Sequence, residues 1–192
     1  SAVYRSGAIY HRKTPDLEVD YFYEEVPQPR IFGWNWFRHP FFMQAGMVDF
    51  DGVLCEDWKS RPEQENDAEF LEHVKNAKPL YIPHVRVAAI VTSRLEKYRP
   101  ECKEWLRKHG VLYSKLIMHP AKTPQERRAA RDHAERKASA YAGDPEANLF
   151  VESDVRQARR IFDITGKPVL CTDTMTCFSK GDHETSGDRG GS

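Results

Sequence analysis

The sequence predicts an α/β protein, a doubly wound three-layer sandwich with a central parallel sheet of about five strands. Three observations support this fold class. Short hydrophobic segments with strand character alternate with helical segments along most of the chain. Acids or hydroxyls follow the first, second and fourth predicted strands, and the carboxyl edge of a parallel sheet is where such folds bind ligands. The length of 192 residues and the 40% share of hydrophobic residues are enough for one well-buried domain.

The first predicted strand, at residues 47–48, leads into Asp49, Phe50, Asp51 and Gly52. In an extended chain Asp49 and Asp51 point to the same side, and Gly52 allows the backbone to leave the sheet and turn around a ligand. Two close carboxylates repel when both are ionised. They are therefore kept together by a divalent cation, by a shared proton, or by acting separately as nucleophile and acid. This spacing predicts phosphate chemistry at the end of the first strand.

Four more strands are predicted from short hydrophobic runs, at residues 85–91, 115–118, 148–151 and 168–171. The second of the five strands closes on Thr92, Ser93 and Arg94. A hydroxyl at this end of a strand suits a phosphate, although it also suits an ordinary turn or helix cap. The fourth strand ends on Glu152-Ser153-Asp154, for which a helix N-cap is the alternative interpretation.

Helices are predicted over about residues 64–77, 100–110, 123–141 and 155–164. Phe70 and Val74 recur at helical spacing in the first of them. The third begins at Thr123-Pro124-Gln125-Glu126, a capping box with proline at the first helical position. We expect it to continue as one long polar helix to about Tyr141, before Gly143.

The chain is predicted to have three parts. Residues 1–43 are expected to be a connector with a dense aromatic segment that packs on the core, although docking onto a missing partner or domain is the alternative. Residues 44–178 hold the alternating strands and helices, and therefore the expected catalytic domain. Residues 179–192 are rich in glycine, serine and charge, which predicts a disordered tail.

Composition excludes several classes of protein. Basic and acidic residues number 29 each, so no global field draws the chain to nucleic acid or to an anionic membrane. The four cysteines form no CxxC pair, which argues against a structural zinc site and for free thiols in a reducing compartment. No signal peptide and no apolar run long enough for a membrane span are present, so a cytoplasmic location is expected.

Three stretches and a lysine follow one another along the chain: Asp49-Phe50-Asp51-Gly52-Val53-Leu54, then Ile90-Val91-Thr92-Ser93-Arg94, the lysine, and Phe150-Val151-Glu152-Ser153-Asp154. In their order and spacing they resemble the four sequence motifs of the haloacid dehalogenase (HAD) superfamily. The resemblance covers about residues 44–172 and implies a HAD-like Rossmannoid fold.

The resemblance implies a Mg²⁺-dependent phosphatase. Asp49 would attack the phosphoryl group and form an aspartyl-phosphate, while Asp51 would protonate the leaving oxygen and later deprotonate water. A Mg²⁺ ion would be held by Asp49, by the backbone carbonyl of Asp51 and by an acid of the fourth motif, either Glu152 or Asp154 or both. That motif departs from the usual paired aspartates or Gly-Asp of the superfamily.

The resemblance also implies ligands for the phosphoryl group and the substrate. Thr92 would donate a hydrogen bond to a phosphoryl oxygen, with Ser93 and Arg94 beside it as substrate-binding residues. A lysine would offset the remaining negative charge. Lys137 has the family-like position upstream of the fourth strand, and Lys122 is its competitor.

About 40 residues separate the first motif from the second, too few for a large cap domain. In this superfamily an open site suggests a large substrate or a lid from another domain or subunit. The segments around residues 26–35, 92–100 and 157–169 are similar to the HAD part of bacterial proteins that join a phosphoribosyltransferase domain to a HAD domain. A phosphoribosyltransferase domain or subunit is therefore an expected partner.

The sequence is compatible with three functions. The first is hydrolysis of a phosphomonoester, with a nucleotide or sugar phosphate as the candidate small-molecule substrate. The second is a low-turnover binding or regulatory module that keeps the fold and the metal site. The third is a nucleic-acid phosphatase, which the neutral net charge argues against.

Overall fold

The computed structural model describes residues 7–11, 21–25, 36–58 and 67–180. The chain divides into two compact units, of which Phe32–Lys180 is one and the remaining terminal residues are the other. Within the terminal unit, β1 (Gly7–His11) and β2 (Tyr21–Glu25) pair in a parallel two-stranded sheet. The expected connector therefore includes two strands. Most of the expected tail, residues 181–192, lies outside the described residues.

A six-stranded sheet organises the larger unit, and its strand order is β5-β4-β3-β6-β7-β8. The strands are β3 (Gly46–Val48), β4 (Val87–Leu95), β5 (Tyr113–His119), β6 (Leu149–Glu152), β7 (Val169–Cys171) and β8 (Thr176–Phe178). The first five are parallel, as predicted, while β8 runs antiparallel to β7 and was not predicted. The protein is thus an α/β protein with a mostly parallel sheet, and β3 lies at its centre.

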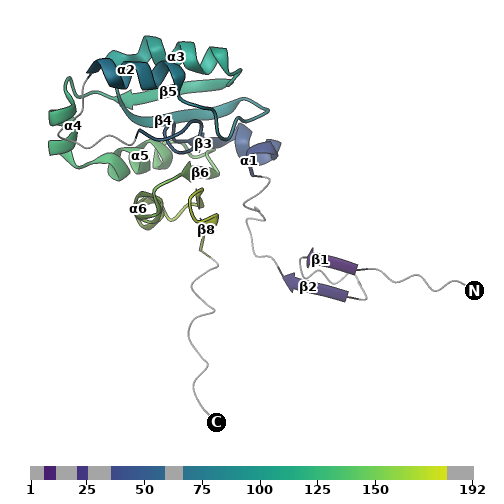
Figure 1. Ribbon diagram of the computed structural model, residues 1–192. Coiled ribbons are helices and arrows are strands. Elements are labelled where there is room, and N and C mark those ends of the chain that lie inside the picture. The colour runs from purple at the N-terminus through teal and green to yellow at the C-terminus, as the bar shows by residue number, and fades with distance from the viewer. Residues whose placement is uncertain (1–6, 12–20, 26–35, 59–66, 181–192) are drawn as a thin grey trace, which may run out of the picture. The chain divides into compact units, whose positions relative to one another are not determined.

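Helices flank both faces of this sheet (Figure 1). They are α1 (Pro40–Gln44), α2 (Asp67–Asn76), α3 (Arg99–Lys108), α4 (Pro124–Ala130), α5 (His133–Ala142) and α6 (Val155–Thr165), with short 3-10 helices at Trp36–Arg38 and Glu96–Tyr98. Figure 1 shows α2 and α3 on one face of the sheet and α5 and α6 on the other, which gives three layers. No helix among the described residues has both the length and the apolar character needed to cross a membrane.

The long helix predicted from Thr123 to Tyr141 is wrong, because the segment forms two helices. Thr123 caps α4 as predicted, since its hydroxyl accepts a hydrogen bond from the Glu126 backbone N–H at 3.1 Å. Arg131 then adopts a left-handed conformation with φ of 49° and ends that helix. The next residue, Asp132, does not continue this helix. One of its carboxylate oxygens lies 3.2 Å from His119 Nε2 on β5. This tertiary contact outweighs the local preference for a continuous helix.

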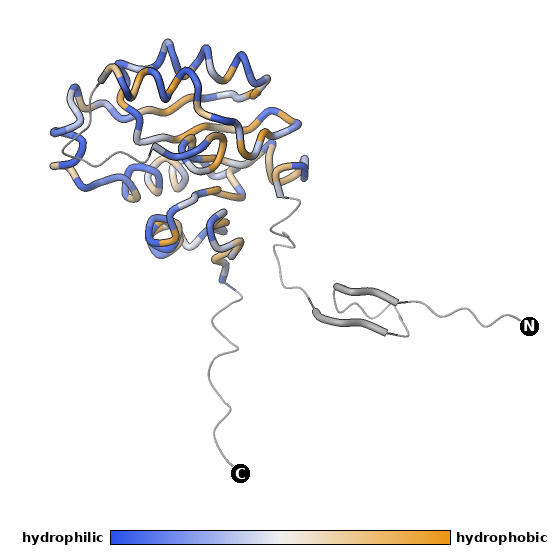
Figure 2. The backbone as a smooth tube through the Cα atoms, viewed as in Figure 1, coloured by the Kyte–Doolittle hydropathy of each residue, from blue (hydrophilic) through white to orange (hydrophobic). Residues whose placement is uncertain are grey.

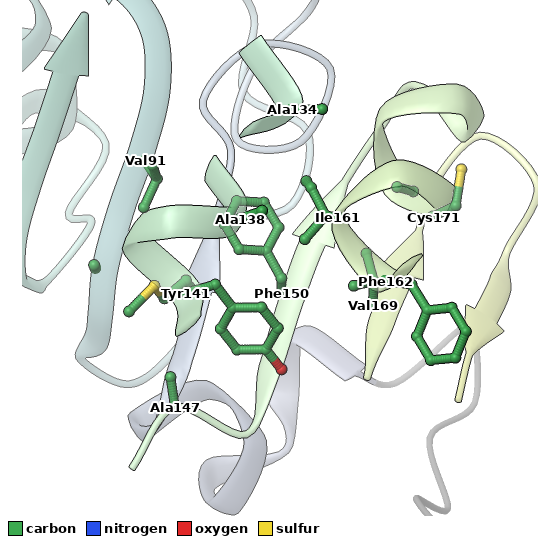
Figure 3. Packing of buried hydrophobic residues seen from close by; sticks show 13 residues of the cluster. Val91, Ala134, Ala138, Tyr141, Ala147, Phe150, Ile161, Phe162, Val169 and Cys171 are labelled. Carbon is green, nitrogen blue, oxygen red and sulfur yellow. The ribbon is translucent and has the colours of Figure 1, made fainter. Parts of the chain in front are cut away.

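One part of the core lies between the sheet and the α5–α6 layer. Phe150 of β6 and Tyr141 of α5 are fully buried, with ring centroids 5.6 Å apart (Figure 3). Burying a side chain of this size stabilises the fold by about 1.5–3 kcal/mol. Figure 2 shows hydrophobic residues concentrated in the central strands and hydrophilic residues along the helices. This is the distribution expected where each helix buries only one face.

The aromatic segment before the first strand is partly in the core. Trp36 is completely buried, with its ring centroid 5.3 Å from that of Tyr81, and Phe42 is buried too. Phe41 is 65% exposed. Packing within this unit therefore covers most of the aromatic surface of residues 36–42.

Candidate active site

A cavity of about 240 Å³ lies at the edge of the sheet where β3, β4 and β6 end. Its lining consists mainly of acids and other polar side chains: Asp49, Asp51, Asp57, Trp58, Phe70, Ser93, Arg127, His133, Lys137, Glu152, Ser153, Asp154 and Gln157. These residues come from segments that are far apart in the sequence. They meet because the carboxyl ends of adjacent parallel strands lie at one edge of the sheet.

Lys137 is the centre of the site. Its ammonium donates hydrogen bonds to Asp49 Oδ2 at 2.7 Å, to Glu152 Oε2 at 2.6 Å and to Gln157 Oε1 at 3.1 Å. Asp49, Lys137 and Glu152 are all at least 94% buried, with exposed fractions of 6%, 2% and 1%. An ammonium has three protons, so these three acceptors use all of them. Lys122, the alternative lysine, is exposed.

One ammonium between two carboxylates leaves an excess negative charge in the site. Burial, together with the nearby charges of Glu152 and Asp51, raises the pKa of Asp49 to about 8 despite its contact with Lys137. Glu152 is held by further donors, since its Oε1 accepts the backbone N–H groups of Ser153 at 2.9 Å and Asp154 at 3.2 Å. A bound cation would relieve this charge excess.

Asp51 is paired with Arg94. The guanidinium donates to both carboxylate oxygens, from Nε at 2.9 Å to Oδ2 and from Nη2 at 2.6 Å to Oδ1. Arg94 is 1% exposed and stacks over the ring of Phe50, with Cζ 3.9 Å from its centroid. Burial alone would raise the pKa of Asp51, but the charge of Arg94 holds that pKa well below its usual range. Arg94 does not line the cavity, although it was expected to bind substrate.

The two acids of the fourth motif have different surroundings. Glu152 is at the buried centre, whereas the Asp154 side chain caps α6 by accepting the backbone N–H groups of Arg156 at 2.8 Å and Gln157 at 3.0 Å. The N-cap interpretation therefore applies to Asp154, which also lines the cavity.

Gly52 is required by its neighbours. It has φ of +74°, and a Cβ atom there would lie 2.2 Å from Ser153 Oγ. That hydroxyl donates to the Asp51 carbonyl at 3.3 Å, which joins the turn after β3 to the turn after β6. A residue larger than glycine would separate the two acid-bearing turns.

Thr92 and Ser93 lie within β4, in its carboxyl-terminal half. The strand runs four residues further than predicted, to Leu95, and its pairing with β5 is irregular between Val91 and Leu95. Thr92 is buried, and its hydroxyl accepts the Arg94 backbone N–H at 3.2 Å. Ser93 lines the cavity, and its hydroxyl lies 2.8 Å from His133 Nδ1.

Three aspartates, Asp49, Asp51 and Asp154, line the cavity. Carboxylate and carbonyl oxygens are the kind of ligand that Mg²⁺ prefers. A second group, Asp51, Cys55 and His73, has ligand atoms within 4.8 Å of one another. Arg94 Nη2 already lies 2.6 Å from Asp51 Oδ1 and 3.3 Å from Cys55 Sγ, so its charge occupies that position. This second group therefore does not fit another cation.

Several residues of the cavity were not predicted, among them Asp57, Arg127, His133 and Gln157. His133 had a detectable signal, because it precedes Lys137 by four residues and so lies on the same face of a helix. The others carry no pattern that separates them from ordinary surface residues.

Comparison with known protein families, with curated proteins and with solved structures gives no match to this chain. The fold class, an α/β protein with a mostly parallel sheet, therefore rests on the structure itself.

Proposed function

We propose that this protein is a Mg²⁺-dependent phosphatase that hydrolyses a phosphomonoester through an aspartyl-phosphate on Asp49. One observation supports this most: the Lys137 ammonium contacts both Asp49 and Glu152, residues 88 and 15 positions away, at the carboxyl edge of the sheet. The resemblance to the HAD motifs predicts this arrangement of the nucleophile, the lysine and the acid of the fourth motif.

The roles follow from position and charge. Asp49 is the nucleophile, because it is the carboxylate at the end of the central strand and lines the cavity. Lys137 keeps its charge, since the carboxylates of Asp49 and Glu152 raise its pKa although burial opposes this. Its positive charge therefore reduces the electrostatic repulsion between the Asp49 carboxylate and an approaching phosphate. The resemblance assigns proton transfer to Asp51 and phosphoryl binding to Thr92.

Mg²⁺ would be held by Asp49, by the carbonyl of Asp51 and by Glu152 or Asp154, and when bound it would neutralise negative charge on the carboxylates and the phosphoryl group. Arg127 and His133 are the cavity's remaining basic side chains for anion binding. The volume of about 240 Å³ lies below the roughly 300–1,000 Å³ of small-molecule pockets. We infer that the cavity takes the phosphoryl end of a nucleotide or sugar phosphate and that the remainder lies at the rim.

Hydrolysis of p-nitrophenyl phosphate with and without Mg²⁺ tests this function. We expect turnover that requires Mg²⁺ and that is lost in Asp49→Asn, which keeps the shape of the side chain but removes the nucleophile. Asp163→Asn is the matched control, because Asp163 is an exposed carboxylate on α6 paired with Arg159. Absence of turnover in the wild-type protein at saturating Mg²⁺ would contradict the proposal.

A second candidate is a low-turnover binding or regulatory module, partnered with a phosphoribosyltransferase domain. It is favoured by the full use of Lys137's donors within the protein and by the pairing of Asp51 with buried Arg94. Both features engage the buried cations, Lys137 and Arg94, in contacts within the protein. Mg²⁺ binding by calorimetry without hydrolysis of any phosphomonoester would favour this candidate over the first.

A further inference from the structure

A second cavity, of about 360 Å³, adjoins the candidate active site. His133, Asp154 and Gln157 line both cavities, so the two share one wall. The side chains of the second cavity come from the end of α4, the first turn of α5 and the first two turns of α6. A substrate whose phosphoryl group lies in the first cavity can therefore extend into the second.

Arginines characterise this second cavity, which we call the arginine cavity. Arg131, Arg156 and Arg160 line it, and all three side chains are exposed. Arg160 Nε donates to Glu135 Oε1 at 2.9 Å, and Arg156 Nη2 lies 3.5 Å from Asp154 Oδ2. Exposed ion pairs of this kind are weak, and each guanidinium has five donors. The arginines therefore keep donors for an anion from solution.

Arg131 is the arginine with the most freedom to bind a ligand. Within the described part of the chain it has no hydrogen-bond or ion-pair partner. It follows α4 with φ of 49°, in the left-handed region where helix ends usually have glycine or asparagine. Glycine would avoid the steric cost of that conformation but would supply no charge. The chain thus places a cation at the edge of the arginine cavity.

The two cavities differ in charge. Among the described residues, the acids of the first cavity outnumber its basic side chains, so a phosphoryl group needs a cation there. In the arginine cavity three arginines face two acids, Glu135 and Asp154. A guanidinium binds phosphate through two parallel hydrogen bonds. The arginine cavity therefore suits a phosphate that binds without a metal ion.

We propose that the arginine cavity binds a second phosphate of the substrate, so that the protein acts on small-molecule bisphosphates such as a nucleoside or sugar bisphosphate. This inference rests on the proposed function for the phosphoryl group that reacts at Asp49. The second phosphate is bound by Arg131, Arg156 and Arg160 and stays on the substrate. These arginines orient the substrate, and they give the bisphosphate its advantage over a monophosphate of the same size.

Matched pairs of substrates test this proposal in the presence of Mg²⁺. The pairs are fructose 1,6-bisphosphate with fructose 6-phosphate, and adenosine 3′,5′-bisphosphate with adenosine 5′-monophosphate. We expect kcat/KM to favour the bisphosphate, and Arg131→Gln to lower the ratio of the two values about 10-fold, mainly through KM. Arg107→Gln is the matched control, because Arg107 is an exposed arginine of α3, paired with Glu104 and outside the lining of both cavities. Partial unfolding of a variant would lower both values and leave their ratio unchanged.

Glu135→Gln should change the ratio in the opposite direction. It removes a negative charge from the arginine cavity and releases Arg160 from its ion pair. We expect the ratio to rise about 2–5-fold. Glu104→Gln breaks a similar exposed pair on α3 and should have no such effect. A ratio that changes in neither Arg131→Gln nor Glu135→Gln would overturn the proposal and leave the phosphatase function standing.

Calorimetry adds a readout that does not depend on turnover. In the Asp49→Asn background with Mg²⁺, we expect the bisphosphate to bind about 10-fold more tightly than the monophosphate. Adding Arg131→Gln should remove this difference. If the wild-type protein hydrolyses no phosphomonoester and the difference in binding is still found, the proposed function fails and the second phosphate site stands. Equal binding of bisphosphate and monophosphate in both pairs would overturn the site itself.

Discussion

Lys137 lies between two buried carboxylates, and its removal would take away the ammonium that pairs with both of them. Lys137→Gln should therefore lower the free energy of unfolding by about 3–5 kcal/mol, measured by urea denaturation at pH 7. Adding Glu152→Gln should restore part of that loss, because one buried charge is then removed as well. Lys75→Gln on the exposed surface of α2 is the control. A double variant no more stable than Lys137→Gln would contradict this account.

The pair formed by Asp51 and Arg94 makes a pH-dependent contribution to stability. Because Arg94 lowers the pKa of Asp51 below the ordinary value of 3.8, the contribution is present above that pH and is lost as the pH falls through the folded-state pKa. Asp51→Asn should cost about 3–5 kcal/mol at pH 7, since Arg94 stays buried without its carboxylate. The difference from wild type should shrink below pH 4.

Thermal or urea unfolding at several pH values measures this difference. Asp163→Asn, which removes an exposed carboxylate, should show little difference from wild type at any pH. A difference for Asp51→Asn that stays constant down to pH 3 would mean that the ion pair does not carry the pH dependence.

At the scale of elements, one side chain at the N-terminus of α6, that of Asp154, has two roles. Asp154 caps the helix and also lines the cavity. Asp154→Asn keeps an oxygen that accepts the two backbone N–H groups, while Asp154→Ala removes it and should cost about 1 kcal/mol of stability. A Mg²⁺ affinity by calorimetry that falls in both variants alike would assign Asp154 to the metal. Affinity unchanged in both would leave Glu152 as the acid that binds it.

The elements with a strong local signal were predicted well. The parallel strands arise from hydrophobic runs with clear boundaries, and Thr123 and Gly166 mark helix ends where the structure has them. The break at Arg131 was not predictable, because residues 126–131 favour a helix locally and the contact of Asp132 with His119 is a tertiary one. The antiparallel β8 has only three residues, too few for a periodic pattern.

Some features of the candidate site could likewise be predicted from the sequence, and others could not. Asp49, Asp51 and Glu152 were predicted from their places at strand ends, and Lys137 from its family-like position upstream of the fourth strand. The pairing of Asp51 with Arg94 could not be predicted, since it joins residues 43 positions apart and depends on side-chain rotamers. The sequence thus identifies groups at the sheet edge, but it does not show how they share their hydrogen bonds.

At the scale of the whole molecule, the central position of β3 has a consequence for folding. The contact between Asp49 and Lys137 closes a loop of 88 residues, and that between Asp51 and Arg94 closes one of 43. Such loops cost entropy before their contacts can form, so long-range pairs of this kind assemble late. Until β4, β6 and α5 are in place, the acids of the turn after β3 have no cationic partners from these elements. We therefore expect mutations at this charged centre to change the unfolding rate more than the folding rate.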